Sequence, residues 1–191
     1  MKKFLLLLML FFGSESTINA EVKRITSGSQ NAKITIIVYE SLTCSHCASF
    51  HEEIYPEIKK DYIDTGLAKI EFRHFPLDVA ALNASKLAQC KNNKSLEILE
   101  ALYSNQQAWI KGGTIDEVNI NLKKFIKKEG FKLNFEKCIN DKEIENFILE
   151  DRIEGTKKFK VNATPTIIIN NKKFEKSLNY KNLKKTLEKL I

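Results

Sequence analysis

The sequence predicts an α/β fold in which a helical segment separates two groups of strands. A β-branched run at 34–38 is typical of a strand covered on both faces. Residues 68–75 alternate apolar and charged side chains, as a second strand would. Strand signals are absent from 78 to about 160, where apolar residues recur at helical spacing, and a β-branched run returns at 166–170. The predicted order is therefore strand, helix, strand, an all-helical insertion of roughly 80 residues, and strand.

Composition describes one globular domain with a basic surface. The chain has 191 residues, 43% hydrophobic and 29% charged, and its seven glycines and three prolines are too few for disorder or collagen. The formal net charge is +7, but only Arg24, Arg73 and Arg152 are arginines, and the lysines are scattered. Because nucleic-acid-binding surfaces more often cluster arginine, we expect no nucleic-acid partner.

The N-terminus is typical of a secretory signal peptide. Two lysines precede nine apolar residues at 4–12, and a short segment ending in Ala20 follows. Nine residues rise only about 13 Å as a helix, against roughly 30 Å of bilayer hydrocarbon, so this segment is too short to span a membrane. We predict a signal peptide at 1–20 and a mature domain at 21–191 in an oxidising compartment, where disulfides persist. A buried N-terminal helix is the alternative interpretation.

The first strand leads directly into a Cys-x-x-Cys at 44–47 and then into a predicted helix that runs to about Asp61. Pro56 is expected to kink this helix, because proline cannot donate a backbone hydrogen bond. The second strand ends at Pro76.

Amphipathic helices fill the insertion. The clearest begins at Thr114, which forms a capping box with Glu117, and ends at Gly130. After 166–170, the Asn170-Asn171 pair predicts a tight turn into a hairpin partner at 172–175. The apolar helical stripes are expected to face the core; they include Ile115, Val118, Leu122, Phe125 and Ile126, then Leu96, Leu99 and Tyr103, then Ile144, Phe147 and Ile148, and finally Tyr180, Leu183, Leu187 and Leu190.

The Cys-x-x-Cys at the start of a helix carries the chemistry. Cys44 would lie over unpaired backbone N–H groups, where the helix dipole favours a thiolate. Cys47, one turn later, would close or resolve a disulfide, and His46 adds a donor or positive charge beside the sulfurs. These residues predict a disulfide-exchange site with Cys44 as the nucleophile.

The same residue types also occur in metal sites, covalent haem sites and purely structural disulfides. A single Cys-x-x-Cys supplies only two zinc ligands, although His46 and His51 leave a copper site as an alternative. Covalent haem is excluded because the residue after Cys47 is Ala48 and not His. A purely structural disulfide is disfavoured, because so small a ring constrains the unfolded chain little. No metal or other cofactor is expected.

Three segments resemble the DsbA-like thiol:disulfide oxidoreductases of bacterial envelopes. They are Tyr-Glu-Ser-Leu-Thr-Cys-Ser-His-Cys at 39–47, Arg-His-Phe-Pro-Leu at 73–77 and Val-Asn-Ala-Thr-Pro-Thr at 161–166. Their order and spacing match across nearly the whole mature chain. The resemblance implies a thioredoxin-like fold with an all-helical insertion, at about 78–160, between the second core strand and the cis-proline strand.

The resemblance also assigns residues to the site. It implies that the Thr164-Pro165 bond is cis and that this loop faces the cysteines and binds extended substrate segments by strand addition. Thr164 would flank the sulfurs and tune both redox poise and substrate release. A trans proline at the start of an edge strand is the alternative interpretation.

Two positions depart from the family pattern. Ser45 stands where many relatives have proline, which leaves the redox potential open. Val38 stands where relatives often have a buried acid that helps to move protons to the second cysteine. Glu40, two residues further along the strand, is a candidate replacement.

Cys90 and Cys138 match positions at which some relatives carry a disulfide. A bridge between them would close a loop of about 49 residues and contribute roughly 4 kcal/mol in the chain-entropy model. Two buried free thiols, or a second redox pair, are the alternatives.

Taken with the resemblance, these residues predict a periplasmic, monomeric oxidase that donates the Cys44–Cys47 disulfide to newly exported proteins. The family implies reoxidation by a membrane quinone-linked partner of the DsbB type. An isomerase or reductase is the alternative within the fold; such enzymes usually carry an extra oligomerisation domain, for which the residues between Ala20 and Lys33 leave no room. A non-enzymatic copper or zinc carrier is the alternative from another class.

Overall fold

A computed structural model describes residues 22–91 and 95–191 of the chain. The predicted signal peptide at 1–20 lies outside the described residues. Within the described ranges, none of the helices is both long enough and apolar enough to cross a bilayer.

A five-stranded mixed sheet forms the centre of the fold, in the order β1-β3-β2-β4-β5. β2 and β3 are parallel, with Ile36 opposite Ile70 and Glu40 opposite His74, and the remaining neighbours are antiparallel. The strands are β1 (Ile25–Gly28), β2 (Ile34–Glu40), β3 (Ala68–His74), β4 (Thr166–Ile169) and β5 (Lys172–Lys173).

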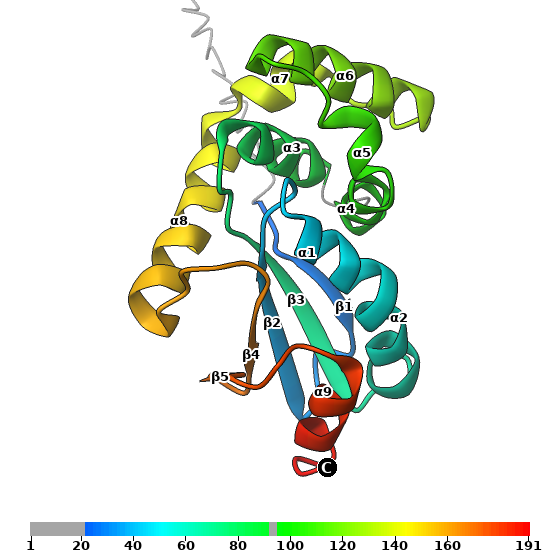
Figure 1. The fold of residues 1–191 in the computed structure, drawn as a ribbon, viewed down its shortest axis with the longest axis vertical. Helices are drawn as coiled ribbons and strands as arrows, with labels where there is room; N and C mark the ends of the chain where they lie inside the picture. Colours follow the sequence, from blue (N-terminus) through cyan, green and yellow to red (C-terminus); the bar gives the residue numbers. More distant parts are fainter. Residues whose placement is uncertain (1–21, 92–94) are drawn as a thin grey trace, which may run out of the picture.

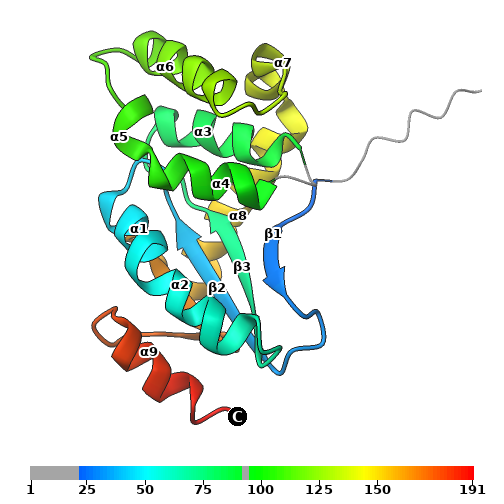
Figure 2. The same ribbon diagram turned by 90° about the vertical axis from the view of Figure 1, so that its right-hand side faces the viewer.

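Helices cover both faces of the sheet and one of its ends (Figure 1). Seen from the side, α9 lies on the same face as α1 and α2 (Figure 2), while α8 lies on the opposite face. Helices α3 to α7 cap the end at which β2 and β3 finish. The helices are α1 (Ser45–Ser49), η1 (Phe50–Ile54), α2 (Tyr55–Ile58), η2 (Lys59–Ile63), α3 (Val79–Gln89), α4 (Ser95–Ser104), α5 (Gln106–Trp109), α6 (Ile115–Lys128), α7 (Phe135–Asn140), α8 (Lys142–Phe159) and α9 (Tyr180–Leu187).

β2 is buried on both faces, and its alternating side chains enter two different cores. Ile36 and Val38 belong to the larger core, which α1, α2 and the helical cap share. Ile37 and Tyr39 belong to a smaller core under α8. Glu40 therefore projects to the same face as Val38, toward the helix that carries the cysteines.

The approach of α8 to the sheet depends on Gly155. A Cβ at this position would lie 2.7 Å from the Tyr39 ring, so only glycine lets the helix pack this closely. The position of α8 matters because the loop that follows it returns to the cysteines.

The predicted fold class is confirmed, with differences in detail. The Thr114–Glu117 capping box is present, and Gly130 adopts a positive φ just beyond α6. β1 was not among the predicted elements. The helix after the cysteines contains two π-helical segments, η1 and η2, on either side of the turn that holds Pro56. Proline cannot make the usual i→i−4 hydrogen bond, and the helix accommodates this by a change of hydrogen-bond register.

Candidate active site

The two cysteines lie where β2 ends and the chain enters α1. Cys44 is the N-cap residue of α1 in an extended conformation, and its carbonyl accepts hydrogen bonds from the N–H groups of Cys47 (3.1 Å) and Ala48 (3.2 Å). Cys44 is partly exposed, Cys47 is fully buried, and both are free thiols. A substrate can therefore reach only Cys44 directly.

The surroundings of Cys44 favour its thiolate. The Cys47 thiol, the Thr164 side chain and the backbone N–H groups of Cys47 and His46 together lower the pKa of Cys44 to about 5, against the opposing effect of burial. At neutral pH the group is therefore an anion held by hydrogen-bond donors at a helix N-terminus.

Cys47 has the opposite electrostatic character. Burial raises the pKa of the Cys47 thiol far above its ordinary range, and the neighbouring Cys44 and the carboxyl group of Glu40 raise it further. The pair thus consists of one exposed, acidic thiol and one buried thiol that holds its proton.

The loop between α8 and β4 faces Cys44. The Thr164-Pro165 peptide bond is cis, as the family resemblance implies. The protonated Cys44 Sγ donates to the Thr164 carbonyl oxygen at 3.3 Å. Among the described residues the buried Thr164 Oγ1 has no other hydrogen-bond partner, so its hydroxyl is available to donate to the thiolate.

A buried polar cluster lies behind Cys47. Glu40 is fully buried, and its Oε2 lies 2.8 Å from Nε2 of His51, whose side chain is 5% exposed. The His51 ring stacks on Tyr103, with the ring centroids 4.1 Å apart. Burial raises the pKa of Glu40, and the attraction of His51 opposes that rise. The carboxyl group and the imidazole therefore form one coupled pair next to the cysteines.

The remaining predicted site residues are distributed as follows. Ser45 and His46 are exposed on the first turn of α1, and it is the His46 backbone N–H that contributes to the pKa of Cys44. Val38 is fully buried in the larger core, where it packs as an apolar side chain. The acidic group on this face of β2 is therefore Glu40.

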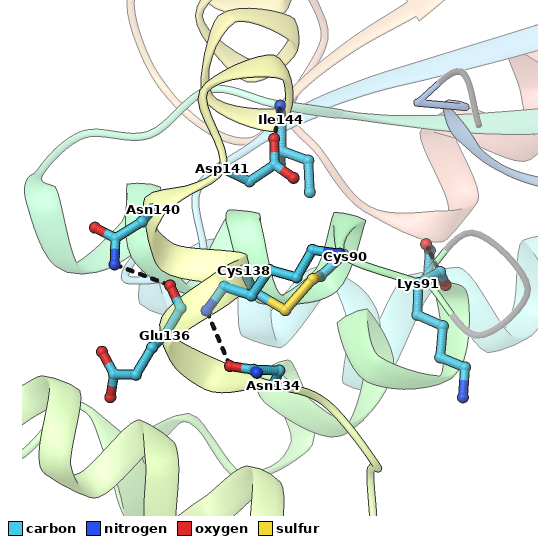
Figure 3. Close-up of a disulfide and its surroundings, with 10 residues drawn as sticks. Cys90, Lys91, Asn134, Glu136, Cys138, Asn140, Asp141 and Ile144 are labelled. Carbon is cyan, nitrogen blue, oxygen red and sulfur yellow. Dashed lines mark hydrogen bonds between the residues drawn. A yellow bond between two sulfur atoms is a disulfide. The ribbon is translucent and has the colours of Figure 1, made fainter. Parts of the chain in front are cut away.

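Cys90 and Cys138 are joined by a disulfide in the helical cap. Figure 3 shows the bridge between Cys90, the C-cap residue of α3, and Cys138 within α7. Beside it, the Cys138 N–H donates to the Asn134 carbonyl. The disulfide links α3, the first helix of the insertion, to α7, and the two cysteines are 48 residues apart in the sequence.

In the part of the chain that the structure describes, no three His, Cys, Asp or Glu side chains gather as a metal site would require. His51 pairs instead with Glu40.

Sequence analysis overlooked Gln106, which is 5% exposed and donates from Nε2 to the carbonyl oxygens of Leu42 (2.8 Å) and Cys44 (3.1 Å). The sequence contained one signal for the position of Gln106. Gln106 lies three residues before the fully buried Trp109, and that spacing places both side chains on one face of a helix.

The chain is similar to known proteins over most of its length. The sequence profile of a family described as Thioredoxin matches residues 20–189. A putative protein-disulfide oxidoreductase of Rickettsia bellii is 30% identical over 147 residues, which cover 75% of this chain and 55% of that protein. Disulfide bond formation protein D of Bacillus subtilis is 28% identical over 171 residues, 85% of this chain and 74% of that protein.

A solved structure has a similar fold. The crystal structure of Wolbachia pipientis alpha-DsbA1 superposes with a TM-score of 0.78 at 31% identity, covering 87% of this chain and 90% of that one. The chain belongs to the thioredoxin family. Within the family it is DsbA-like: its fold and its Cys-x-x-Cys pair are those of a thiol:disulfide oxidoreductase. The chain spans little more than half the length of the Rickettsia relatives that it matches.

Proposed function

We propose that this protein is a periplasmic dithiol oxidase that donates a disulfide between Cys44 and Cys47 to newly exported proteins. The observation that carries the proposal is the low pKa of Cys44 beside a buried Cys47. A stable thiolate favours the reduced form of the pair, which makes the disulfide a strong oxidant. The names of the Rickettsia and Bacillus relatives support the same class of reaction.

The reaction takes place in two exchanges. A substrate thiolate attacks Sγ of Cys44, the Cys44–Cys47 bond breaks, and Cys47 leaves with the bonding electrons and takes up a proton. A second substrate thiolate then attacks the substrate sulfur of the mixed disulfide. Cys44 leaves as the thiolate, for which its low pKa makes it a good leaving group. The substrate loses two electrons, and the reduced enzyme ends with a Cys44 thiolate and a protonated Cys47 thiol.

The proton for Cys47 comes from the Glu40–His51 pair. Both side chains are almost fully buried, Glu40 Oε2 lies 2.8 Å from His51 Nε2, and the carboxyl group is close enough to Cys47 to raise the pKa of its thiol. A Cys47 thiolate is strongly disfavoured in this setting, so its departure requires protonation. Glu40 thus takes the role that relatives give to an acid at the position of Val38.

The Thr164-Pro165 loop binds the substrate segment around the attacking thiol. The Thr164 carbonyl already contacts Cys44 Sγ, so an extended segment paired with this loop would place its own sulfur close to Cys44. Both residues are partly exposed, which leaves the loop open to a partner.

The proposal includes the cellular setting. The predicted signal peptide at 1–20 would export the chain to the periplasm, where it would work as a monomer. A membrane partner of the DsbB type, linked to quinone, would reoxidise the dithiol, as the family resemblance implies.

This function is tested by mixing a reduced dithiol peptide with one equivalent of the oxidised protein and measuring oxidation of the peptide. We expect one peptide disulfide per protein and complete loss of oxidation with Cys44→Ser. Normal activity in Cys44→Ser would remove Cys44 from its role. Reactivation of scrambled substrates by the reduced protein, without net oxidation, would identify an isomerase. Tight stoichiometric copper or zinc binding without exchange would identify a metal carrier.

A further inference from the structure

The turn that carries Cys44 is held from outside by residues of the helical insertion. On one side, the Thr43 hydroxyl donates to Asp78 Oδ2 at 2.7 Å, and Asp78 is the N-cap of α3. On the other side, Gln106 of α5 donates to the carbonyls of Leu42 and Cys44. Together these contacts fix the three consecutive residues 42–44, just before the first turn of α1.

Gln106 is built into the protein as a rigid donor. Its side chain is 5% exposed, so water does not compete for its amide. One turn later the fully buried Trp109 donates from Nε1 to the Leu102 carbonyl at 2.9 Å and anchors the short helix. The two amide hydrogens match the two carbonyls, one for each.

The held carbonyls fix the geometry on which the Cys44 thiolate depends. The Cys44 carbonyl also accepts from the Cys47 and Ala48 N–H groups and so begins the helix. The His46 and Cys47 N–H groups that stabilise the thiolate lie in that same turn. Rotation of the peptide units at Leu42 or Cys44 would turn these donors away from Sγ.

We infer that Gln106 is a positioning residue for the disulfide-exchange reaction: it locks the Leu42–Cys44 backbone so that the N-terminal N–H groups of α1 point at Cys44 Sγ. The helical insertion thereby sets the redox behaviour of the core site. The inference rests on the proposed role of Cys44. Gln106 does not touch the substrate and acts only through the backbone of the turn.

Gln106→Leu tests the inference, because it keeps a similar volume and removes both donations. Thiolate absorbance and alkylation rate against pH would give the pKa of Cys44, and equilibration with glutathione buffers would give the dithiol–disulfide equilibrium. Each of the two lost hydrogen bonds is worth about 0.5–1.5 kcal/mol, and only the part that acts on the Cys44 thiolate reaches the dithiol–disulfide equilibrium. We therefore expect the pKa to rise and the equilibrium to shift about two- to tenfold toward the disulfide, a tenfold shift being about 30 mV.

Gln107→Leu is the matched control, since Gln107 is the next residue of α5 and is exposed. Gln106→Met, with an unbranched side chain, is measured in parallel so that a folding defect in one variant does not decide the result. A folded Gln106 variant with unchanged pKa and equilibrium, or an equal shift in Gln107→Leu, would overturn the inference. A wild-type Cys44 with an ordinary pKa would instead overturn the proposed function.

Discussion

At the scale of single residues, the site depends on two thiols with opposite surroundings. Cys44 lies at a helix N-terminus beside Thr164, and Cys47 is buried against Glu40. The same two atoms in a symmetrical setting would exchange disulfides without a preferred direction. The surroundings of the two sulfurs therefore set the redox properties of the pair.

Glu40→Gln tests the source of the proton for Cys47. The amide keeps the size of the carboxyl group but does not exchange a proton, so release of Cys47 on attack by a substrate thiolate should slow by at least about tenfold. Rapid quenching with an alkylating agent follows formation of the mixed disulfide. Glu52→Gln, which alters an exposed carboxylate of η1 in the helix that follows Cys47, is the control, and equal rates in wild type and Glu40→Gln would refute the relay.

His74 makes folding stability depend on pH. Burial lowers the pKa of His74 to about 4 from its ordinary 6.5, so between these values the unfolded chain binds a proton that the folded chain does not. The free energy of unfolding should fall as the pH drops from 6.5 to 4, by about 3 kcal/mol at most.

Urea denaturation of wild type and His74→Leu at pH 4 and pH 7 isolates this effect. The variant should lose less stability than wild type on acidification. Asp151, whose pKa burial raises to about 6, has the opposite pH dependence but is present in both proteins and cancels in the difference. Parallel pH profiles for the two proteins would show that His74 titrates normally in the fold.

At the scale of elements, patterns with strong local causes were predictable from the sequence. β2 follows from its β-branched run, and α6 from the Thr114–Glu117 box and its apolar stripe. β1 has only four residues and is stabilised by pairing with β3. No local sequence pattern predicts that pairing. Gln106 was missed because its partners are backbone carbonyls more than 60 residues away, and its spacing to Trp109 indicates only a shared helix face.

Asp78 caps α3 and also contacts the turn before Cys44, so we predict that it stabilises both the helix and the turn. Its Oδ1 accepts from the Ala81 N–H at 2.7 Å as the cap of α3, while Oδ2 accepts from Thr43. Asp78→Ala should lower the free energy of unfolding by about 1–2 kcal/mol, measured by denaturation. Asp116→Ala removes a first-turn charge of α6 that is not a cap, and an equal loss there would contradict the capping assignment.

At the scale of the whole molecule, the thioredoxin-like core and the helical insertion form one connected structure. The larger core includes side chains from the sheet, from α1 and α2, and from the insertion helices. The insertion also reaches the turn before Cys44 through Asp78 and Gln106. An insertion that merely covered the sheet would make no such contacts.

The Cys90–Cys138 disulfide stabilises that insertion. It closes a long loop, so the double variant Cys90→Ala/Cys138→Ala should lose up to about 4 kcal/mol of unfolding free energy. Thermal denaturation checks the loss, and thiolate titration should give an unchanged pKa for Cys44. A shifted Cys44 pKa without loss of stability would make the pair a redox regulator.

The reduction potential of the Cys44–Cys47 pair, measured by equilibrating the mature protein with glutathione buffers, tests the central claim most directly. A thiolate as stable as that of Cys44 predicts a potential well above the roughly −270 mV of thioredoxin and toward the roughly −120 mV of DsbA. A value at or below that of thioredoxin would contradict the role of disulfide donor and identify a reductase.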